Sequence, residues 1–272
     1  MHFANRITQV SPSATLTINS RAAQLRSQGR DVVSLAAGEP DFSPPEHVLQ
    51  AAREAVDNKH TGYTPVSGIP ELLTAISGYF SFYYGINPEN NMVTTTNGGK
   101  QGLYNLLQVM LNPGEEVIIP APYWVSYPEM IKLASGTPVV VPTEPENNFQ
   151  VNTKQLEESL TDKTKILILN TPSNPTGAHY SQKDLDAIIE WAMQKNIYVI
   201  SDEIYDQLVY APAEKSTAVK WFESHPQNVA VVNGLSKSFA MTGLRVGFVL
   251  ADPQVISNLN KLQGQRTSNI CS

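Results

Sequence analysis

Residues 234–247 read GLSKSFAMTGLRVG and follow a short apolar run at 229–232. Lys237 lies among small residues with no neighbouring carboxylate, and a weakly solvated lysine gives up its proton more readily. Arg245, eight residues later, keeps its charge and offers planar donors to an anion. The segment therefore pairs an amine that can react with a cation that can hold an anion.

This pairing of Lys237 with Arg245 suits pyridoxal phosphate. The aldehyde of that cofactor reacts with a neutral amine, and its phosphate needs hydrogen-bond donors. The alternative interpretation is that the two side chains are surface charges that flank a loop. The segment alone leaves both interpretations open. Only the first requires that the rest of the chain supplies the other groups that bind and activate the cofactor.

Length and composition favour a globular protein that acts on a small molecule. With 272 residues, 41% of them apolar, the chain can form one large α/β domain or two modest ones. The net charge is −6, and its 19 basic and 25 acidic residues are dispersed, so we expect neither nucleic acid nor a membrane as partner. A single cysteine, Cys271, excludes an internal disulfide and a multi-cysteine metal site, and we predict no metal. No apolar run has the length of a signal peptide or a membrane span, so we expect a cytoplasmic location.

Apolar patterning supports the α/β class independently, because predicted strands alternate with predicted helices. The expected strands are 32–35, 92–96, 116–120, 138–142, 165–170, 198–201, 229–232 and 246–250. The expected helices are 12–29, 45–58, 70–80, 97–107, 153–160, 181–195 and 252–263. The run at 165–170 is continuously apolar, which indicates a strand buried on both faces.

The segment around the lysine resembles the signature of the class I/II aminotransferases, which are fold-type I enzymes that use pyridoxal phosphate. The match rests on the small residues before Lys237, the Ala240-Met241 pair and the Gly243-x-Arg245-x-Gly247 ending. The aromatic neighbourhood at 122–128 is most similar to the aspartate and prephenate aminotransferase subgroup. The resemblance covers nearly the whole chain.

The resemblance implies an aminotransferase-like large domain, with a mainly parallel seven-stranded sheet between helices, and part of a small α+β domain. Residues 1–45 would form the N-terminal arm and part of the small domain, and residues 46–272 the large domain that binds the cofactor. Members of the family continue beyond the segment that corresponds to residue 272. That continuation would complete the small domain and supply the arginine that clamps the substrate carboxylate, so we keep open that the chain is a fragment or a variant with impaired substrate binding.

A glycine turn between a predicted strand and a predicted helix is a candidate phosphate site. Amide groups at the start of a helix suit an anion, although neither the Walker A nor the Gly-x-Gly-x-x-Gly spacing is present. On residues alone this turn is weak support for binding. The resemblance implies that the amides of three turn residues and two later side chains hold the cofactor phosphate: Gly98, Gly99, Lys100, Ser236 and Arg245.

Four further candidates follow the ends of predicted strands, where ligands of open α/β sheets collect. The ring of Trp124 can stack on a flat heterocycle, and the Asn174 amide can donate to a phenolate oxygen. A buried Asp202 would keep a pyridine nitrogen protonated, and Tyr205 could address the phenolate oxygen. The structural alternatives are core filling for Trp124, turn formation for Asn174-Pro175 and a helix cap for Asp202.

The resemblance assigns catalysis to three residues. Lys237 would hold the cofactor covalently, be displaced by substrate, and move the proton between the substrate Cα and the cofactor. Asp202 would sustain the electron withdrawal, and Tyr205 would tune the phenolate together with Asn174. Both Asp202 and Tyr205 are thus also cofactor-binding residues.

Substrate and dimer contacts follow from the resemblance alone. Gly38 lies in a turn that reads as an ordinary loop from its residues, yet the resemblance makes it a substrate contact together with Trp124 and Asn174. Tyr63, in a Pro/Gly loop, would reach the cofactor phosphate of a second copy. This implies a homodimer with shared active sites.

The sequence therefore predicts a pyridoxal phosphate-dependent aminotransferase of amino acid biosynthesis, acting between an amino acid and a 2-oxo acid. Aspartate is the first substrate candidate, with prephenate, glutamate and aromatic amino acids as alternatives. Another pyridoxal phosphate chemistry, such as that of a β-lyase or decarboxylase, uses the same electron withdrawal and stays open. From a different class, the chain could be a non-catalytic cofactor-binding or dimerisation fragment.

Overall fold

A computed structural model describes residues 2–36 and 38–272 of the chain. Seven strands form one sheet in the order β1-β7-β6-β5-β4-β2-β3. The strands are β1 Val93–Asn97, β2 Glu116–Ala121, β3 Thr137–Pro142, β4 Thr164–Asn170, β5 Tyr198–Asp202, β6 Val229–Gly234 and β7 Val246–Leu250. β7 runs antiparallel to β1 and β6, and the other neighbours are parallel. The predicted seven-stranded, mainly parallel sheet is confirmed.

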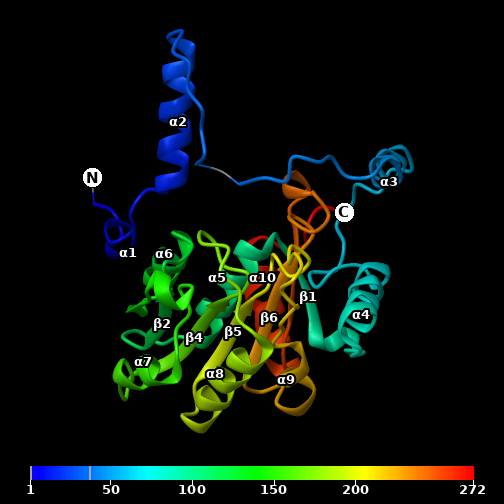
Figure 1. The fold of residues 1–272 in the computed structure, drawn as a ribbon. Helices are drawn as coiled ribbons and strands as arrows, with labels where there is room; N and C mark the ends of the chain where they lie inside the picture. Colours follow the sequence, from blue (N-terminus) through cyan, green and yellow to red (C-terminus); the bar gives the residue numbers. More distant parts are fainter. Residues whose placement is uncertain (1, 37) are drawn as a thin grey trace.

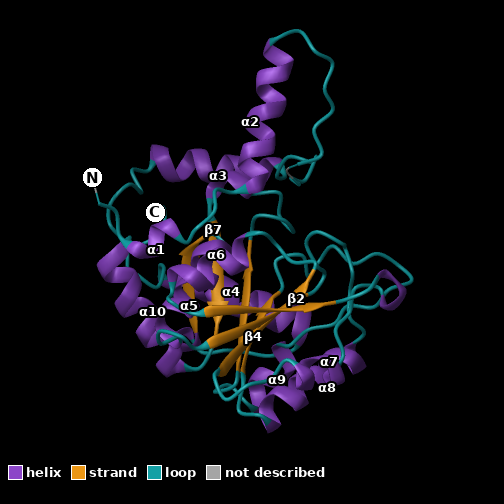
Figure 2. Ribbon diagram, turned by 90° about the vertical axis from the view of Figure 1, so that its left-hand side faces the viewer, coloured by secondary structure: helices purple, strands orange, loops and turns teal. Residues whose placement is uncertain are grey.

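Helices cover both faces of this sheet (Figure 2). They are α1 Asn5–Thr8, α2 Ala14–Ser27, α3 Glu46–Asp57, α4 Pro70–Tyr84, α5 Gly99–Met110, α6 Ser126–Leu133, α7 Thr153–Glu158, α8 Gln182–Gln194, α9 Val219–Ser224 and α10 Pro253–Arg266. Short 3-10 turns occupy Asn90–Met92, Pro145–Asn147 and Thr242–Leu244. The predicted helices are found, whereas α1, α6 and α9 were not predicted.

Two apolar cores lie on opposite faces of the sheet. Helices α5, α6 and α10 bury one face, and α4, α7, α8 and α9 bury the other. In β4, Ile166 and Ile168 point into the first core, while Leu167 and Leu169 point into the second. The continuous apolar run at 165–170 is therefore buried on both faces, as its sequence indicates.

One edge of the sheet gathers the chain segments that hold the predicted site residues. The parallel strands β2, β4, β5 and β6 end there, β1 ends beside them, and the antiparallel β7 begins there. The registers pair Asn170 with Asp202, and Gly234 with Gly247. Loops from five strands consequently meet at one place, which is where ligands of open α/β sheets bind.

The N-terminal part of the chain lies away from the sheet (Figure 1). Helix α2 stands out from the body and buries only Ala22, and α3 buries no residue. The strand predicted at 32–35 is wrong, because this segment is extended without a paired neighbour and Leu35 is 93% exposed. A β-rich sequence forms a strand only when a partner supplies the hydrogen bonds. The domain boundary between residues 45 and 46 stays a prediction.

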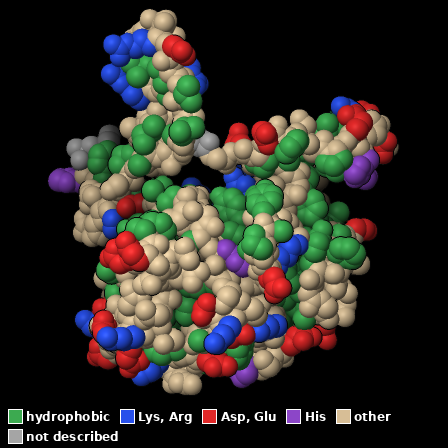
Figure 3. Space-filling model, in the orientation of Figure 1, with side chains coloured by type: hydrophobic (Ala, Val, Ile, Leu, Met, Phe, Trp, Pro, Cys, Tyr) green, Lys and Arg blue, Asp and Glu red, His purple; other side chains and the backbone are tan. Residues whose placement is uncertain are grey.

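Charged side chains of both signs are mixed over the end of the molecule that lies away from α2 (Figure 3). Apolar side chains of the N-terminal part are exposed, among them Leu16, Ile18 and Val33. Over the described ranges, no helix is both long and apolar enough to cross a membrane.

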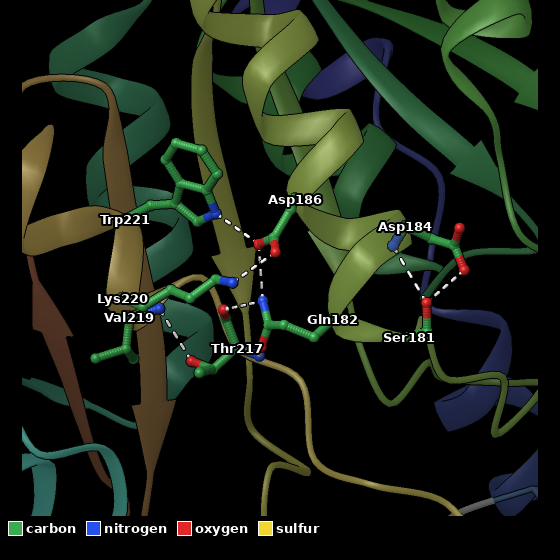
Figure 4. Close-up of polar contacts among 8 residues, drawn as sticks. All are labelled: Ser181, Gln182, Asp184, Asp186, Thr217, Val219, Lys220 and Trp221. Carbon is green, nitrogen blue, oxygen red and sulfur yellow. Dashed lines mark hydrogen bonds and ion pairs between the residues drawn. The ribbon is translucent and has the colours of Figure 1, made fainter.

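A polar cluster joins α8 to α9, which cover the same face of the sheet (Figure 4). Asp186 of α8 accepts hydrogen bonds from Lys220 at 2.5 Å and from the indole of Trp221 at 2.7 Å. Gln182 of α8 both donates to and accepts from the backbone of Thr217, at 3.0 Å each. These contacts hold the segment that leads into α9 against α8.

Candidate active site

Lys237 lies in the turn after β6 and is half-buried. Its Nζ donates a hydrogen bond to the carbonyl oxygen of Gly38 at 2.7 Å and lies 5.8 Å from the ring centroid of Tyr205. The structure thus brings together Lys237, Gly38 and Tyr205, all predicted from the sequence. The N-terminal arm crosses the lysine at this point.

The electrostatics around Lys237 favour its neutral form. Burial lowers the pKa of Lys237, Glu39 opposes this shift, and the positive charge of Arg245 adds to it. Glu39 is held beside the lysine turn, because its Oε1 accepts a hydrogen bond from Thr242 at 3.0 Å. A lysine with a lowered pKa is a better nucleophile and base near neutral pH.

Asp202 is fully enclosed at the end of β5. Its Oδ2 accepts a hydrogen bond from the Tyr127 hydroxyl at 2.6 Å, and its Oδ1 accepts from the amide of Ile204 at 3.3 Å. Burial raises the pKa of Asp202 to about 6, although the two hydrogen bonds work in the opposite direction. A carboxyl group with this pKa can share a proton with a basic ring nitrogen placed against it.

Asn174 and Tyr205 form a polar pair above the ends of β4 and β5. The Asn174 amide lies 3.4 Å from the Tyr205 hydroxyl, and the Asn174 backbone N–H donates to Asn170 Oδ1 at 2.8 Å. Asn170 in turn donates to the carbonyl of Asp202 at 2.9 Å. Burial and the Asp202 charge raise the pKa of Tyr205, so its hydroxyl stays protonated and can donate to an oxygen of a ligand.

The glycine turn between β1 and α5 packs directly against Arg245. A Cβ at Gly98 would lie 2.1 Å from Arg245 Nη2, and a Cβ at Gly247 would lie 2.3 Å from the Gly99 nitrogen. Arg245 donates from Nη2 to the carbonyl of Asn97 at 3.3 Å. The guanidinium is therefore held against the bare backbone of the turn, and only glycine permits this approach.

The same turn presents free amide donors. In the ranges 2–36 and 38–272, no protein acceptor pairs with the backbone N–H of Gly99 or Lys100, at the start of α5. Helix N-termini and guanidinium groups both attract anions. Two unpaired amides beside the exposed Arg245 make a cradle that fits a phosphate group, so the residues present fit the phosphate end of the predicted cofactor.

Lys100 and Trp124 lie together on the other side of the turn. The Lys100 Nζ is 4.8 Å from the centroid of the Trp124 ring, and the edge of Trp124 meets Tyr127 at 5.5 Å between centroids. Burial, with a contribution from Arg245, lowers the pKa of Lys100. Because Tyr127 also donates a hydrogen bond to Asp202, the contact between Trp124 and Tyr127 connects this side of the turn to Asp202.

Two predicted residues stay outside these contacts. Ser236 is buried, but within the described chain its hydroxyl makes no hydrogen bond to protein. Tyr63 is 96% exposed, so its side chain is available to a second molecule and makes no contribution to the site of its own chain.

Tyr127 and Asn170 both make hydrogen bonds to Asp202, and neither was a candidate from the sequence. Tyr127 is 75 positions from Asp202 in the chain, and its Pro-rich surroundings resemble a loop rather than the start of α6. Asn170 is the last residue of β4. Its position at the end of a predicted strand could have indicated a ligand-binding role, because ligands of open α/β sheets bind at strand ends.

Among the described residues, no group of three or more His, Cys, Asp or Glu side chains is arranged to hold a metal ion.

Comparison with known proteins identifies the family. Residues 30–272 match the family described as aminotransferase class I and II. An asparagine–oxo-acid transaminase of Streptococcus mutans is 42% identical over 268 residues, which are 98% of this chain and 68% of that protein. An aspartate/prephenate aminotransferase of Thermus thermophilus is 42% identical over 268 residues, with the same two shares.

Solved structures agree with the sequence match. The aspartate aminotransferase of Thermus thermophilus with maleate superimposes with a TM-score of 0.95 at 41% identity, covering 100% of this chain and 70% of that chain. Because the sequence match extends over residues 30–272 and the fold is shared, the protein belongs to the class I and II aminotransferase family and is a transaminase.

Proposed function

We propose that this transaminase uses pyridoxal phosphate bound at Lys237 to exchange an amino group between aspartate and a 2-oxo acid. Class I and II aminotransferases use this cofactor. The single observation that carries the proposal is the half-buried Lys237 Nζ beside Tyr205, at the same sheet edge as Asp202 and the Gly98 turn. An amine, a buried carboxylate and an anion cradle are the three groups that the cofactor needs.

The cofactor phosphate would be held by the amides of Gly99 and Lys100 and by the guanidinium of Arg245. The unpaired amides and the close approach at Gly98 support this assignment. The Ser236 hydroxyl is proposed as a further donor. Tyr63 of a second copy would complete the cradle, which makes a homodimer part of the proposal.

Bound pyridoxal phosphate would withdraw electrons from the Cα of an attached amino acid and so make the Cα proton acidic. Asp202 would keep the ring nitrogen protonated, because a buried negative charge favours the cationic form. Asn174 and Tyr205 would donate to the phenolate oxygen. Lys237 Nζ, once neutral, would remove the Cα proton of the substrate and hold it.

The substrate would lie between the N-terminal arm and the Trp124 side of the site. We assign Gly38, Trp124 and Asn174 to its lining, because Gly38 contacts Lys237 and Asn174 contacts Tyr205. Aspartate is the first substrate candidate, because the aspartate/prephenate aminotransferase of Thermus thermophilus is 42% identical to this chain. Asparagine is the second, because an equally similar relative is an asparagine–oxo-acid transaminase.

The test is a visible absorption spectrum of the chain with pyridoxal phosphate, before and after an amino acid is added. We expect the band of lysine-bound cofactor, which aspartate converts to the amine form of the cofactor with release of the 2-oxo acid. Lys237→Ala should lose the band, while Lys261→Ala, a change of an exposed lysine on α10, should keep it.

Each other result has a definite meaning. Conversion by asparagine in preference to aspartate would make the second substrate the correct one. Ammonia or carbon dioxide as product would indicate elimination or decarboxylation. A band that no amino acid alters would indicate a chain that binds cofactor without catalysis, and full turnover by Lys237→Ala would refute the assignment of the lysine.

A further inference from the structure

A buried carboxylate, Asp206, joins three segments around the lysine turn. The side chain is 3% exposed. Its Oδ2 accepts hydrogen bonds from the hydroxyls of Tyr79 and Tyr84, both on α4. Its Oδ1 accepts from Ser238 Oγ at 3.2 Å. One side chain thus links α4, the turn after β5 and the residue next to Lys237.

The donors to Asp206 found in the described part of the chain are all neutral. Besides the two tyrosines and Ser238, the amide of Gln207 donates to Oδ2 at 3.1 Å. A buried carboxylate without a cation is costly unless several donors surround it. Burial and nearby negative charge raise the pKa of both Tyr79 and Tyr84, so both hydroxyls keep their protons and remain donors.

Asp206 is next to Tyr205 in the chain, and it is hydrogen-bonded to Ser238, which is next to Lys237. The Lys237 Nζ lies 5.8 Å from the Tyr205 ring and is half-buried. Its lowered pKa has burial as the main cause, so both the reach and the basicity of the amine depend on where the backbone at 237–238 is held.

We propose that Asp206 is a positioning residue of the transamination reaction, which fixes Ser238 and thereby sets Lys237 against Tyr205. The inference rests on the proposed function, because it takes Lys237 as the reacting amine. The bonds to Tyr79 and Tyr84 anchor the carboxylate to α4. The hydrogen bond from Ser238 to this carboxylate then holds the lysine turn in place.

The experiment follows Lys237 itself in the 272-residue chain. The first readout is the pH profile of Lys237 acetylation in the cofactor-free protein, measured by mass spectrometry with exposed Lys261 as internal standard. The second is the rate at which the chain captures pyridoxal phosphate covalently. Neither readout requires turnover.

Ser238→Ala is the principal variant, because it removes only the link and leaves Asp206 with its tyrosine donors. We expect the midpoint pH of Lys237 acetylation to rise, since a less buried amine is more easily protonated. Capture of the cofactor should slow by about tenfold or more, because a small misplacement of a reacting group is costly. The melting temperature should stay close to that of the parent chain.

Two substitutions of Asp206 separate position from charge. Asp206→Asn keeps an acceptor oxygen for the tyrosines and can turn its amide nitrogen toward Ser238 Oγ, so it should keep most of the parent behaviour. Asp206→Ala should behave like Ser238→Ala or worse. The matched control is Asp186→Ala, which breaks the polar cluster of Figure 4 away from the lysine and should leave both Lys237 readouts unchanged.

Two results would overturn the proposal. One is a folded Ser238→Ala chain with the acetylation midpoint and capture rate of the parent. The other is an equal effect from Asp186→Ala, which would attribute the change to general stability. Failure of the proposed function is separately visible, because a Lys237→Ala chain would then capture cofactor as the parent does, while the acetylation profile of the cofactor-free protein still reports on Asp206.

Discussion

Replacing Gly98 by alanine tests the cradle that this glycine forms with Arg245. The backbone of Gly98 has φ 78° and ψ 160°, a region open almost only to glycine, so strain should cost on the order of 1–3 kcal/mol. The new Cβ would lie 2.1 Å from Arg245 Nη2. Normal contact begins near about 3.5 Å, so the guanidinium must retreat by about 1.4 Å. Because it ends a flexible side chain, this movement adds little to the loss of stability.

The matched control is Gly114→Ala, in the turn between α5 and β2. Gly114 also has a positive φ, 84°, but an added Cβ would meet nothing within 4 Å. We expect both variants to lose stability in urea unfolding. Only Gly98→Ala should bind pyridoxal phosphate more weakly, by about tenfold or more, because a charge-assisted hydrogen bond contributes about 1.5–3 kcal/mol. Equal cofactor affinity in the two variants, measured by absorbance titration, would refute the cradle.

Three further substitutions probe the site and its support. Tyr127→Phe removes a donor that lowers the pKa of Asp202, so the acid limb of the activity profile should move to higher pH, and an unchanged limb would contradict the contact. Burial raises the pKa of Glu203 from 4.5 to about 7, so the folded chain holds this proton more tightly and stability falls as pH rises between those values, by about 3 kcal/mol. Glu203→Gln should remove that slope in urea unfolding from pH 4.5 to 7.5, whereas a slope equal to that of the parent would exclude Glu203 as its source. Gly247→Ala would place a Cβ 2.3 Å from a backbone nitrogen of the glycine turn and should cost about 3 kcal/mol or more, while Gly243→Ala, with nothing within 4 Å, serves as control in the same melting assay.

Local patterns in the sequence predict most of the sheet and its helices. The apolar runs that form β4, β5 and β6 favour buried strands, and most of their residues are buried in the sheet. Ser181 and Asp252, which are typical helix caps, accept backbone hydrogen bonds at the starts of α8 and α10. The segment at 32–35 has the composition of a strand but no partner beside it. α6 was missed because Pro122 lies shortly before it and Pro128 lies in its first turn, and both residues are typical of turns.

Candidate site residues could be predicted from the sequence only where the residue stands in a short motif of neighbouring residues. Lys237, Asp202 and Asn174 each stand in a short motif, so their type and place suggest a role. The contact between Tyr127 and Asp202 joins positions 75 apart, and that between Tyr79 and Asp206 joins positions 127 apart. Such contacts depend on how strands are ordered in the sheet, which no local pattern states.

The most direct test of the account is to locate the residue that captures pyridoxal phosphate. The chain is incubated with the cofactor, treated with borohydride, digested and analysed by mass spectrometry. We predict that the reduced cofactor is found on Lys237, and that Lys237→Ala leaves no other lysine labelled to the same extent. Labelling spread over exposed lysines such as Lys261, or undiminished in Lys237→Ala, would contradict the claim that this half-buried amine is the cofactor site.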